Sequence, residues 1–118
     1  MFTLANDDNT NTVTQMPQAM LATLQGQLNN EVLQHLRANL LAQAESSYRP
    51  KAIIELTGIS SMGKHDYLFL LETARMLQLM GVKTILVGMR PGIIAGLSML
   101  GLDLSQIPGE CDLERALE

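Results

Sequence analysis

The fold is decided by residues 51–66, KAIIELTGISSMGKHD. Residues 52–56 are nearly all apolar, which is typical of a strand buried on both faces. After Gly63 the apolar residues change to the three-to-four spacing of one helical face, and Gly81 favours the end of this helix. A strand, a turn and a helix in this order predict one unit of an α/β sheet.

Upstream of this unit, the chain predicts another strand and another helix. Residues 19–24 are mostly apolar, and the strand they predict ends at Gly26. Asn29 or Asn30 can then cap a helix, because an Asn side chain accepts a hydrogen bond from free amides of the first turn. Apolar residues recur at helical spacing until Pro50 stops the pattern.

Downstream, the same alternation continues. Residues 82–87 predict a second buried strand, and Pro91 can begin a short helix because its missing N–H costs nothing in the first turn. Gly101 ends that helix. Residues 107–108 are expected to form an edge segment or short strand, and Asp112 is expected to cap a last short helix.

Together these elements predict a single domain over residues 12–118, preceded by a flexible N-terminal segment, residues 1–11. Residues 12–16 are the candidate for a further short strand. The fold class is α/β, with a small mixed, mostly parallel sheet and about four helices packed mainly on one face.

Composition excludes several functions. Hydrophobic residues make up 47% of the chain and charged residues 17%, so a packed domain is expected. Aromatic residues are only 3% and the net charge is −4, which disfavours nucleic acid as a partner. The acidic excess lies after residue 102, because seven basic residues balance seven acidic ones before it.

The single cysteine, Cys111, cannot form an internal disulfide and is expected to be a small structural residue. With His35 and His65 it provides no metal-ligand cluster, so no metal is predicted. His35 is expected on a helix surface. No apolar run approaches the roughly 20 residues that span a bilayer, so we expect a cytosolic protein without membrane insertion.

Gly58, Gly63 and Lys64 match the first seven positions of the phosphate-loop pattern G-x-x-x-x-G-K-[ST]. The eighth position is His65, and a neutral imidazole is a poor ligand for magnesium. Nucleotide hydrolysis is therefore disfavoured. A small-anion or nucleotide-binding module that uses the amides of residues 58–64 remains an alternative.

No complete catalytic set is present, and no cofactor is predicted. Asp66 and His65 with Ser60 or Ser61 resemble a nucleophile set, but adjacent positions do not by themselves aim side chains at one another. An N-cap role for Asp66, or for a Ser, is the simpler interpretation. Four methionines are expected in the core rather than as ligands: Met76, Met80, Met89 and Met99.

Lys64 is the exception to these simple interpretations. It opens a helix whose first turn carries partial positive charge, an unfavourable arrangement worth roughly 0.3–1 kcal/mol. Either Asp66 offsets this charge or an anionic group docks there.

The run from residue 51 to residue 108 resembles the STAS domain, and within it the stressosome scaffold proteins, which are relatives of anti-sigma-factor antagonists. The resemblance covers residues 12–118. It rests on ELTGI at 55–59, LMGVKTILVGMRP at 79–91 and LGLDL at 100–104. It implies the mixed sheet predicted above, in a fold like that of SpoIIAA.

The resemblance also implies two phosphorylation sites in the family. The family's Asp-Ser or Asp-Thr pair, which a switch serine/threonine kinase phosphorylates, falls on Gly63 and Lys64 here. The second phosphorylated Thr falls on Val87. Neither of these two positions can therefore be phosphorylated. Ser60 and Ser61 are candidate substitutes, although neither occupies the matching position. The predicted partner-binding loop consists of Ser60, Ser61, Met62, Gly63, Lys64 and His65.

The function implied by the resemblance is a non-catalytic regulatory module for protein–protein interaction. Its expected partners are other STAS scaffold subunits, with a switch kinase or an anti-sigma factor as further candidates, and it is expected to form a homo-oligomer. An accessory subunit of a lipid-transport complex is a second alternative.

Overall fold

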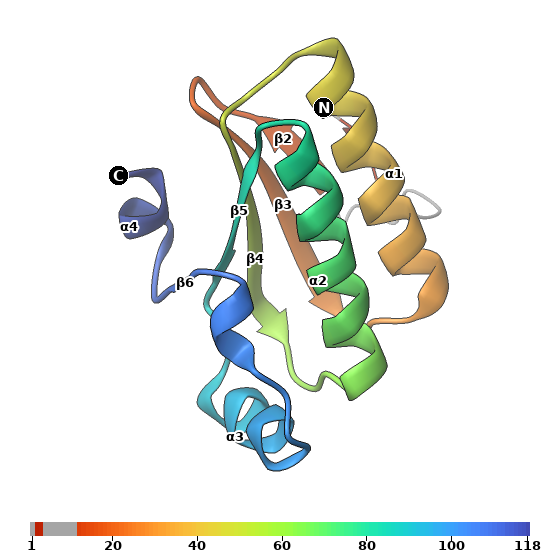
Figure 1. Ribbon diagram of the computed structural model, residues 1–118, viewed down its shortest axis with the longest axis vertical. Helices are drawn as coiled ribbons and strands as arrows, with labels where there is room; N and C mark the ends of the chain where they lie inside the picture. The colour runs from red at the N-terminus through yellow and green to blue at the C-terminus, as the bar shows by residue number, and fades with distance from the viewer. Residues whose placement is uncertain (1, 4–11) are drawn as a thin grey trace.

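The computed structural model of the protein describes residues 2–3 and 12–118 and contains one six-stranded sheet in the order β1-β2-β3-β4-β5-β6 (Figure 1). The elements are β1 (Phe2–Thr3), β2 (Thr12–Gln15), β3 (Ala19–Gly26), α1 (Asn30–Ser46), β4 (Lys51–Ile59), α2 (Lys64–Leu79), β5 (Lys83–Val87), α3 (Pro91–Met99), the 3-10 helix η1 (Leu104–Gln106), β6 (Gly109–Glu110) and α4 (Leu113–Leu117). The predicted α/β fold is confirmed.

The sheet is mixed. Strands β1, β2 and β3 pair antiparallel, whereas β3, β4, β5 and β6 pair in parallel. The carboxyl ends of the four parallel strands therefore lie at the same edge of the sheet, where α2 and α3 also begin. Strand β1 was not anticipated from the sequence. The rest of the N-terminal segment expected over residues 1–11 lies outside the described residues.

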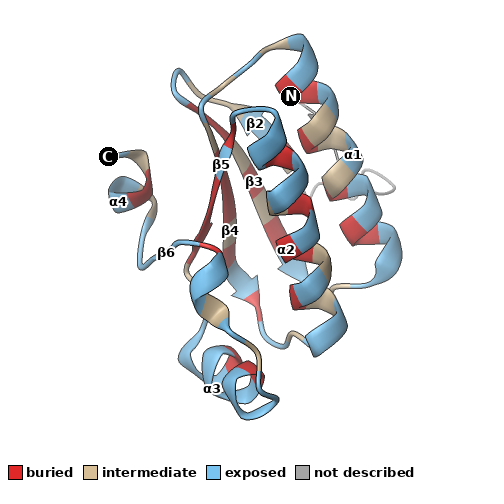
Figure 2. Ribbon diagram, in the orientation of Figure 1, coloured by how far each residue is buried: buried red, intermediate tan, exposed pale blue. Residues whose placement is uncertain are grey.

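Helices α1 and α2 cover one face of the sheet, as expected (Figure 1). The buried residues of these two helices, coloured red in Figure 2, pack on that face of the sheet. The short helix α4 covers the opposite face, where Ala116 packs with Ile53 and Ile85. Strands β4 and β5 are thus buried on both faces of the sheet, which explains the nearly continuous apolar runs of these two strands.

The local signals at the helix ends are confirmed. The Asn29 side chain accepts a hydrogen bond from the Val32 amide at 2.8 Å and caps α1. Asp112 accepts from the Arg115 amide at 3.0 Å and caps α4. Gly81 follows α2 with φ +81°, a left-handed conformation that favours glycine.

One predicted strand was misplaced. The edge strand expected at residues 107–108 lies two residues later, as β6. The Pro108 carbonyl does accept a hydrogen bond from the Leu86 amide at 2.9 Å. However, proline has no N–H to donate in return, so the ladder begins only at Gly109. Ile107 instead is a buried core residue.

The expectation of buried methionines was also wrong for three of the four. Met99 is 87% exposed, Met76 38% and Met80 37%, because these residues lie on the outward faces of α3 and α2 or just after α2. Met89 is partly buried against the main core. Cys111 is exposed, so it is not a structural core residue.

We expect Gly88→Ala to destabilise the protein more than Gly101→Ala. Both glycines have positive φ, which costs an alanine about 1–2 kcal/mol. At Gly88 the added Cβ would also overlap the Thr57 hydroxyl, whereas at Gly101 it meets nothing within 4 Å. The overlap adds about 1–3 kcal/mol. Urea denaturation of both variants measures the difference, and equal losses of stability would contradict this account of Gly88.

Candidate functional site

The predicted partner-binding loop connects β4 to α2 at the carboxyl edge of the sheet (Figure 1). Ser60 and Ser61 are exposed, and Met62 is half-buried against the main core. Lys64 and His65 form the start of α2 and are exposed. The loop therefore exposes small polar residues and one cation to solvent, while the Met62 side chain packs against the core.

Asp66 fixes the point at which α2 begins. Its carboxylate accepts a hydrogen bond from the Gly63 amide at 2.9 Å, and the Tyr67 amide donates to the Gly63 carbonyl at 3.1 Å. The predicted N-cap role for Asp66 or a Ser is wrong in position: Gly63 is the N-cap, and Asp66, the third residue of α2, accepts from its amide. Its negative charge in the first turn also offsets the partial positive charge of the helix end.

These contacts weaken the resemblance to a phosphate loop. Gly58 and Ile59 belong to β4 and pair with Gln25 and Gly26. A side chain at Gly58 would crowd β3, since a Cβ would lie 3.2 Å from the Leu24 carbonyl oxygen. Close packing between strands thus explains this glycine. The Gly63 amide is occupied by Asp66, so the loop does not present a continuous row of free amides.

Lys64 is the first residue of α2, and its side chain has no ion pair or hydrogen bond among residues 2–3 and 12–118. With Asp66 satisfying the helix end, the ammonium group is free to face a partner. The position therefore carries a permanent positive charge.

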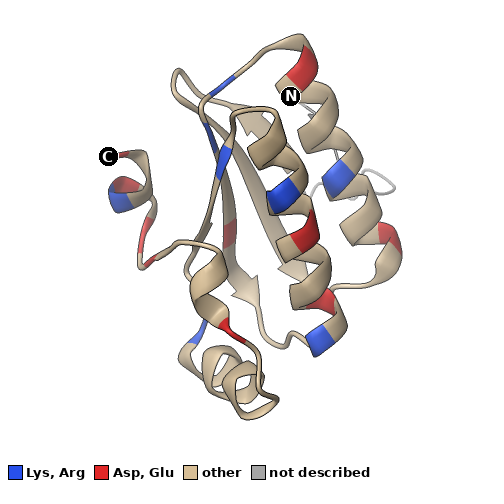
Figure 3. Ribbon diagram, in the orientation of Figure 1, with Lys and Arg blue, Asp and Glu red and all other residues tan. Residues whose placement is uncertain are grey.

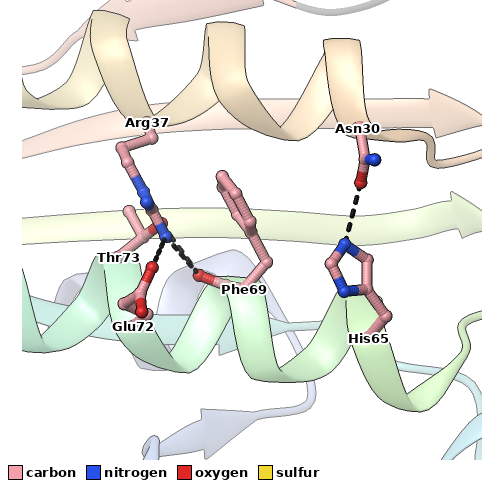
Figure 4. Close-up of polar contacts among 6 residues, drawn as sticks. All are labelled: Asn30, Arg37, His65, Phe69, Glu72 and Thr73. Carbon is pink, nitrogen blue, oxygen red and sulfur yellow. Dashed lines mark hydrogen bonds and ion pairs between the residues drawn. The ribbon is translucent and has the colours of Figure 1, made fainter.

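His65 connects α2 to α1. Its Nε2 donates to the side-chain oxygen of Asn30 at 2.8 Å (Figure 4), and its ring lies 6.5 Å from the Phe69 ring, centroid to centroid. It is bonded to neither Ser60 nor Ser61. A nucleophile set built on His65 is therefore not assembled in this structure.

Arg37 forms a second connection between the two helices that the sequence did not reveal. Its guanidinium lies 3.7 Å above the Phe69 ring and pairs with the Glu72 carboxylate at 2.7 Å. It also donates to the Thr73 hydroxyl at 2.9 Å. Figure 4 shows its contacts with the Glu72 carboxylate and the Phe69 carbonyl. Sequence spacing places Arg37 on the polar face of α1, but only the packing of α1 against α2 shows which residues it meets.

The loop borders α3 across a hollow of about 320 Å³. Arg90, the residue before α3, donates from Nε and Nη2 to the Thr57 carbonyl at 3.2 and 3.1 Å. This contact holds the start of α3 against the end of β4. The hollow is lined by Ser60, Ser61, Met62, Arg90, Gly92, Ile93 and Gly96.

Val87, at the second family phosphorylation position, is the last residue of β5 and only 1% exposed. It packs on the sheet face that α4 covers. The structure therefore places Val87 in the core and apart from the loop surface.

Within the described part of the chain, no group of three or more His, Cys, Asp or Glu side chains could hold a metal ion. In the same residues, no helix is long and apolar enough to cross a membrane. Charged residues are sparse in the strands and occur mainly in the helices and the connecting segments (Figure 3).

The sequence profile of the STAS domain matches residues 11–115. The protein belongs to the STAS domain family. No curated protein gave a significant match to its sequence.

Solved structures agree with this assignment of the fold. A serine-to-glutamate variant of RsbS from Moorella thermoacetica is 18% identical, with a TM-score of 0.77 and 91% of each chain covered. A stressosome chain is also 18% identical, with a TM-score of 0.75 over 90% of this chain and 92% of that one. Unphosphorylated SpoIIAA, an anti-sigma factor antagonist, is 16% identical, with a TM-score of 0.68 over 91% and 93%.

We expect Asp66→Ala to lower the free energy of unfolding by about 0.5–2 kcal/mol, because it removes the carboxylate that accepts from the Gly63 amide. Glu45→Ala is the matched control. Glu45 is an exposed residue near the C-terminal end of α1, and its substitution should change the free energy of unfolding by no more than about 0.5 kcal/mol. Thermal unfolding of both variants tests this, and a loss no larger than that of the control would argue against the cap.

Proposed function

We propose that this protein is a non-catalytic regulatory module of the anti-sigma-factor antagonist or stressosome scaffold type. It binds another protein through the loop of residues 60–65. The observation that carries the proposal is Lys64, an exposed and unpaired cation at the first position of α2, where the family resemblance places a phosphorylated Ser or Thr.

The physical consequence is a fixed electrostatic state. Phosphorylation adds nearly two negative charges to a helix N-terminus, and a kinase and a phosphatase can add and remove them. Lys64 supplies one positive charge that neither enzyme changes. The proposed module is therefore constitutive: a partner that accepts the lysine stays bound, and one that requires the phosphate or the free hydroxyl does not bind.

Other STAS subunits are the partners that the surface supports best, with a switch kinase or an anti-sigma factor next. Helix α3, beside the loop, contains no charged residue, and apolar side chains near and on it are exposed: Ile94 by 42%, Met99 by 87% and Leu100 by 56%. Exposed apolar groups next to a docking loop favour a protein partner, including a second copy of this chain.

The anion-binding alternative has less support. Its amide cradle would need residues 58–64 to leave their amides free, but residues 58 and 59 are paired in the sheet and the Gly63 amide donates to Asp66. The lipid-transport alternative has no feature of the described residues in its favour.

We expect a stressosome-type switch kinase with ATP to leave the wild-type protein unphosphorylated at Ser60 and Ser61. The double variant Gly63→Asp with Lys64→Ser restores the Asp-Ser pair of the family and should accept phosphate. Gly63 has φ −89°, so an Asp fits its backbone. Mass spectrometry after incubation locates the phosphate. Stoichiometric phosphate on Ser60 or Ser61 of the wild-type protein would refute the loss of the switch.

A charge reversal separates stability from binding. Lys64→Glu should raise the free energy of unfolding by about 0.3–1 kcal/mol, because a negative charge suits the helix N-terminus. The same change should weaken the complex with the protein that the wild type captures from its native cell extract, by about tenfold or more.

Lys83→Glu is the control for this experiment, because Lys83 is an exposed lysine at the far end of β5. It makes the same change in net charge and should leave the affinity unaltered. Calorimetric titration of both variants against the captured protein gives the comparison. Equal effects of the two substitutions would show that the loop is not the docking surface.

A further inference from the structure

A second feature lies at the same edge of the sheet but apart from Lys64. The ends of β4, β5 and β6 meet α2, α3 and η1 around a cavity of about 670 Å³. This volume is in the range of small-molecule sites, and the carboxyl ends of parallel strands are where α/β proteins commonly bind ligands.

The walls of this cavity are mainly apolar. They come from several elements, so the cavity does not depend on one loop, and it is open to solvent on one side. The apolar lining residues are Leu86, Met89, Pro91, Ile94, Leu104 and Ile107. Such a lining matches a ligand with an apolar body.

Tyr67, on the first turn of α2, also lines the cavity and is 1% exposed. Its hydroxyl is buried and has no hydrogen-bond partner among residues 2–3 and 12–118. A buried hydroxyl without a partner is unfavourable and uncommon in folded proteins, and a bound ligand is one explanation for it.

Arg90 supplies the second polar group. Two of its N–H groups donate to the Thr57 carbonyl, which leaves further donors of the guanidinium at the cavity rim. Tyr67 and Arg90 therefore both offer hydrogen-bond donors, and a ligand that satisfies them needs an acceptor atom.

The charges around the cavity argue against an anionic ligand. Glu110 lines it, and Asp103 is close enough to Tyr67 to act on its titration. Burial, and then the negative charge of Asp103, raise the pKa of the Tyr67 hydroxyl, so the phenol keeps its proton and remains a donor at neutral pH. One arginine at the rim does not outweigh these acidic groups.

We propose that this cavity binds a small uncharged molecule with an apolar body and a carbonyl oxygen, which accepts hydrogen bonds from the Tyr67 hydroxyl and Arg90. The Tyr67 hydroxyl is buried at the cavity wall, so a ligand reaches it only when a lining side chain moves aside. None of residues 60–65 lines this cavity, so the proposal does not depend on the partner-binding loop or on Lys64.

The test uses benzylacetone, an uncharged ketone, as the probe and isotope-labelled full-length protein as the target. Butylbenzene, which lacks the acceptor, and phenylbutyrate, which adds a negative charge, are matched controls. We expect benzylacetone at millimolar concentration to shift the amide signals of residues 86–94 and 104–111, and to bind more tightly than either control. No shift in these residues, or tighter binding of phenylbutyrate, would overturn the proposal.

Two variants test the contacts. Tyr67→Phe removes the hydroxyl without emptying the core, and should weaken benzylacetone binding about fivefold while leaving butylbenzene binding unchanged. Tyr48→Phe is the control, because the Tyr48 hydroxyl bonds to the Gly81 carbonyl outside the cavity. Ile94→Trp, a partly exposed lining position, should fill the space and abolish binding of both probes.

The outcomes are distinct from those for the partner-binding loop. Lys64→Glu should not change benzylacetone binding. If Tyr67→Phe binds the ketone as tightly as the wild type does, the proposed acceptor contact is wrong. If Ile94→Trp still binds it, the cavity is not the site.

Discussion

Strand β4 pairs in parallel with β3 on one side and with β5 on the other, and this pairing positions the loop of residues 60–65 and the start of α2. Alternate residues of β4 serve two cores: Ile54 faces the layer of α1 and α2, and Ile53 faces α4. A slip of one residue in this register would exchange the two sets and move the loop. Because both faces of β4 are apolar and buried over residues 52–54, this part of the strand specifies the register that places the loop at its end.

The helix that follows is stabilised by its own residues. Asp66 occupies the Gly63 amide and brings a negative charge to the positive end of α2, so no outside anion is needed there. This distinguishes the loop from a phosphate cradle, in which the amides and the helix end stay free for the ligand. It also explains how Lys64 can begin a helix, because the negative charge of Asp66 in the first turn of α2 offsets the unfavourable effect of the lysine charge.

The sequence predicted what local chemistry determines. The buried strands, the Asn29 and Asp112 caps and the glycine after α2 each follow from a few adjacent residues. Features that depend on packing between distant segments were missed. The contacts of Arg37 with Phe69 and Glu72 require the register of α1 on α2, and the cavity around Tyr67 requires six elements to converge. The exposure of Met99 likewise depends on how α3 sits at the sheet edge, which helical spacing does not specify.

Local charge, and not net charge, governs which surfaces can dock at the loop. The net charge of −4 arises after residue 102, from five acidic residues and one arginine between Asp103 and Glu118. At physiological ionic strength, charges separated by more than about 8 Å are largely screened from one another. A partner in contact with the loop therefore experiences mainly the charges at this edge of the sheet, among them the exposed Lys64 and Arg90, which lines the hollow beside the loop. A surface that complements the acidic end of the molecule has no electrostatic reason to bind at these cations.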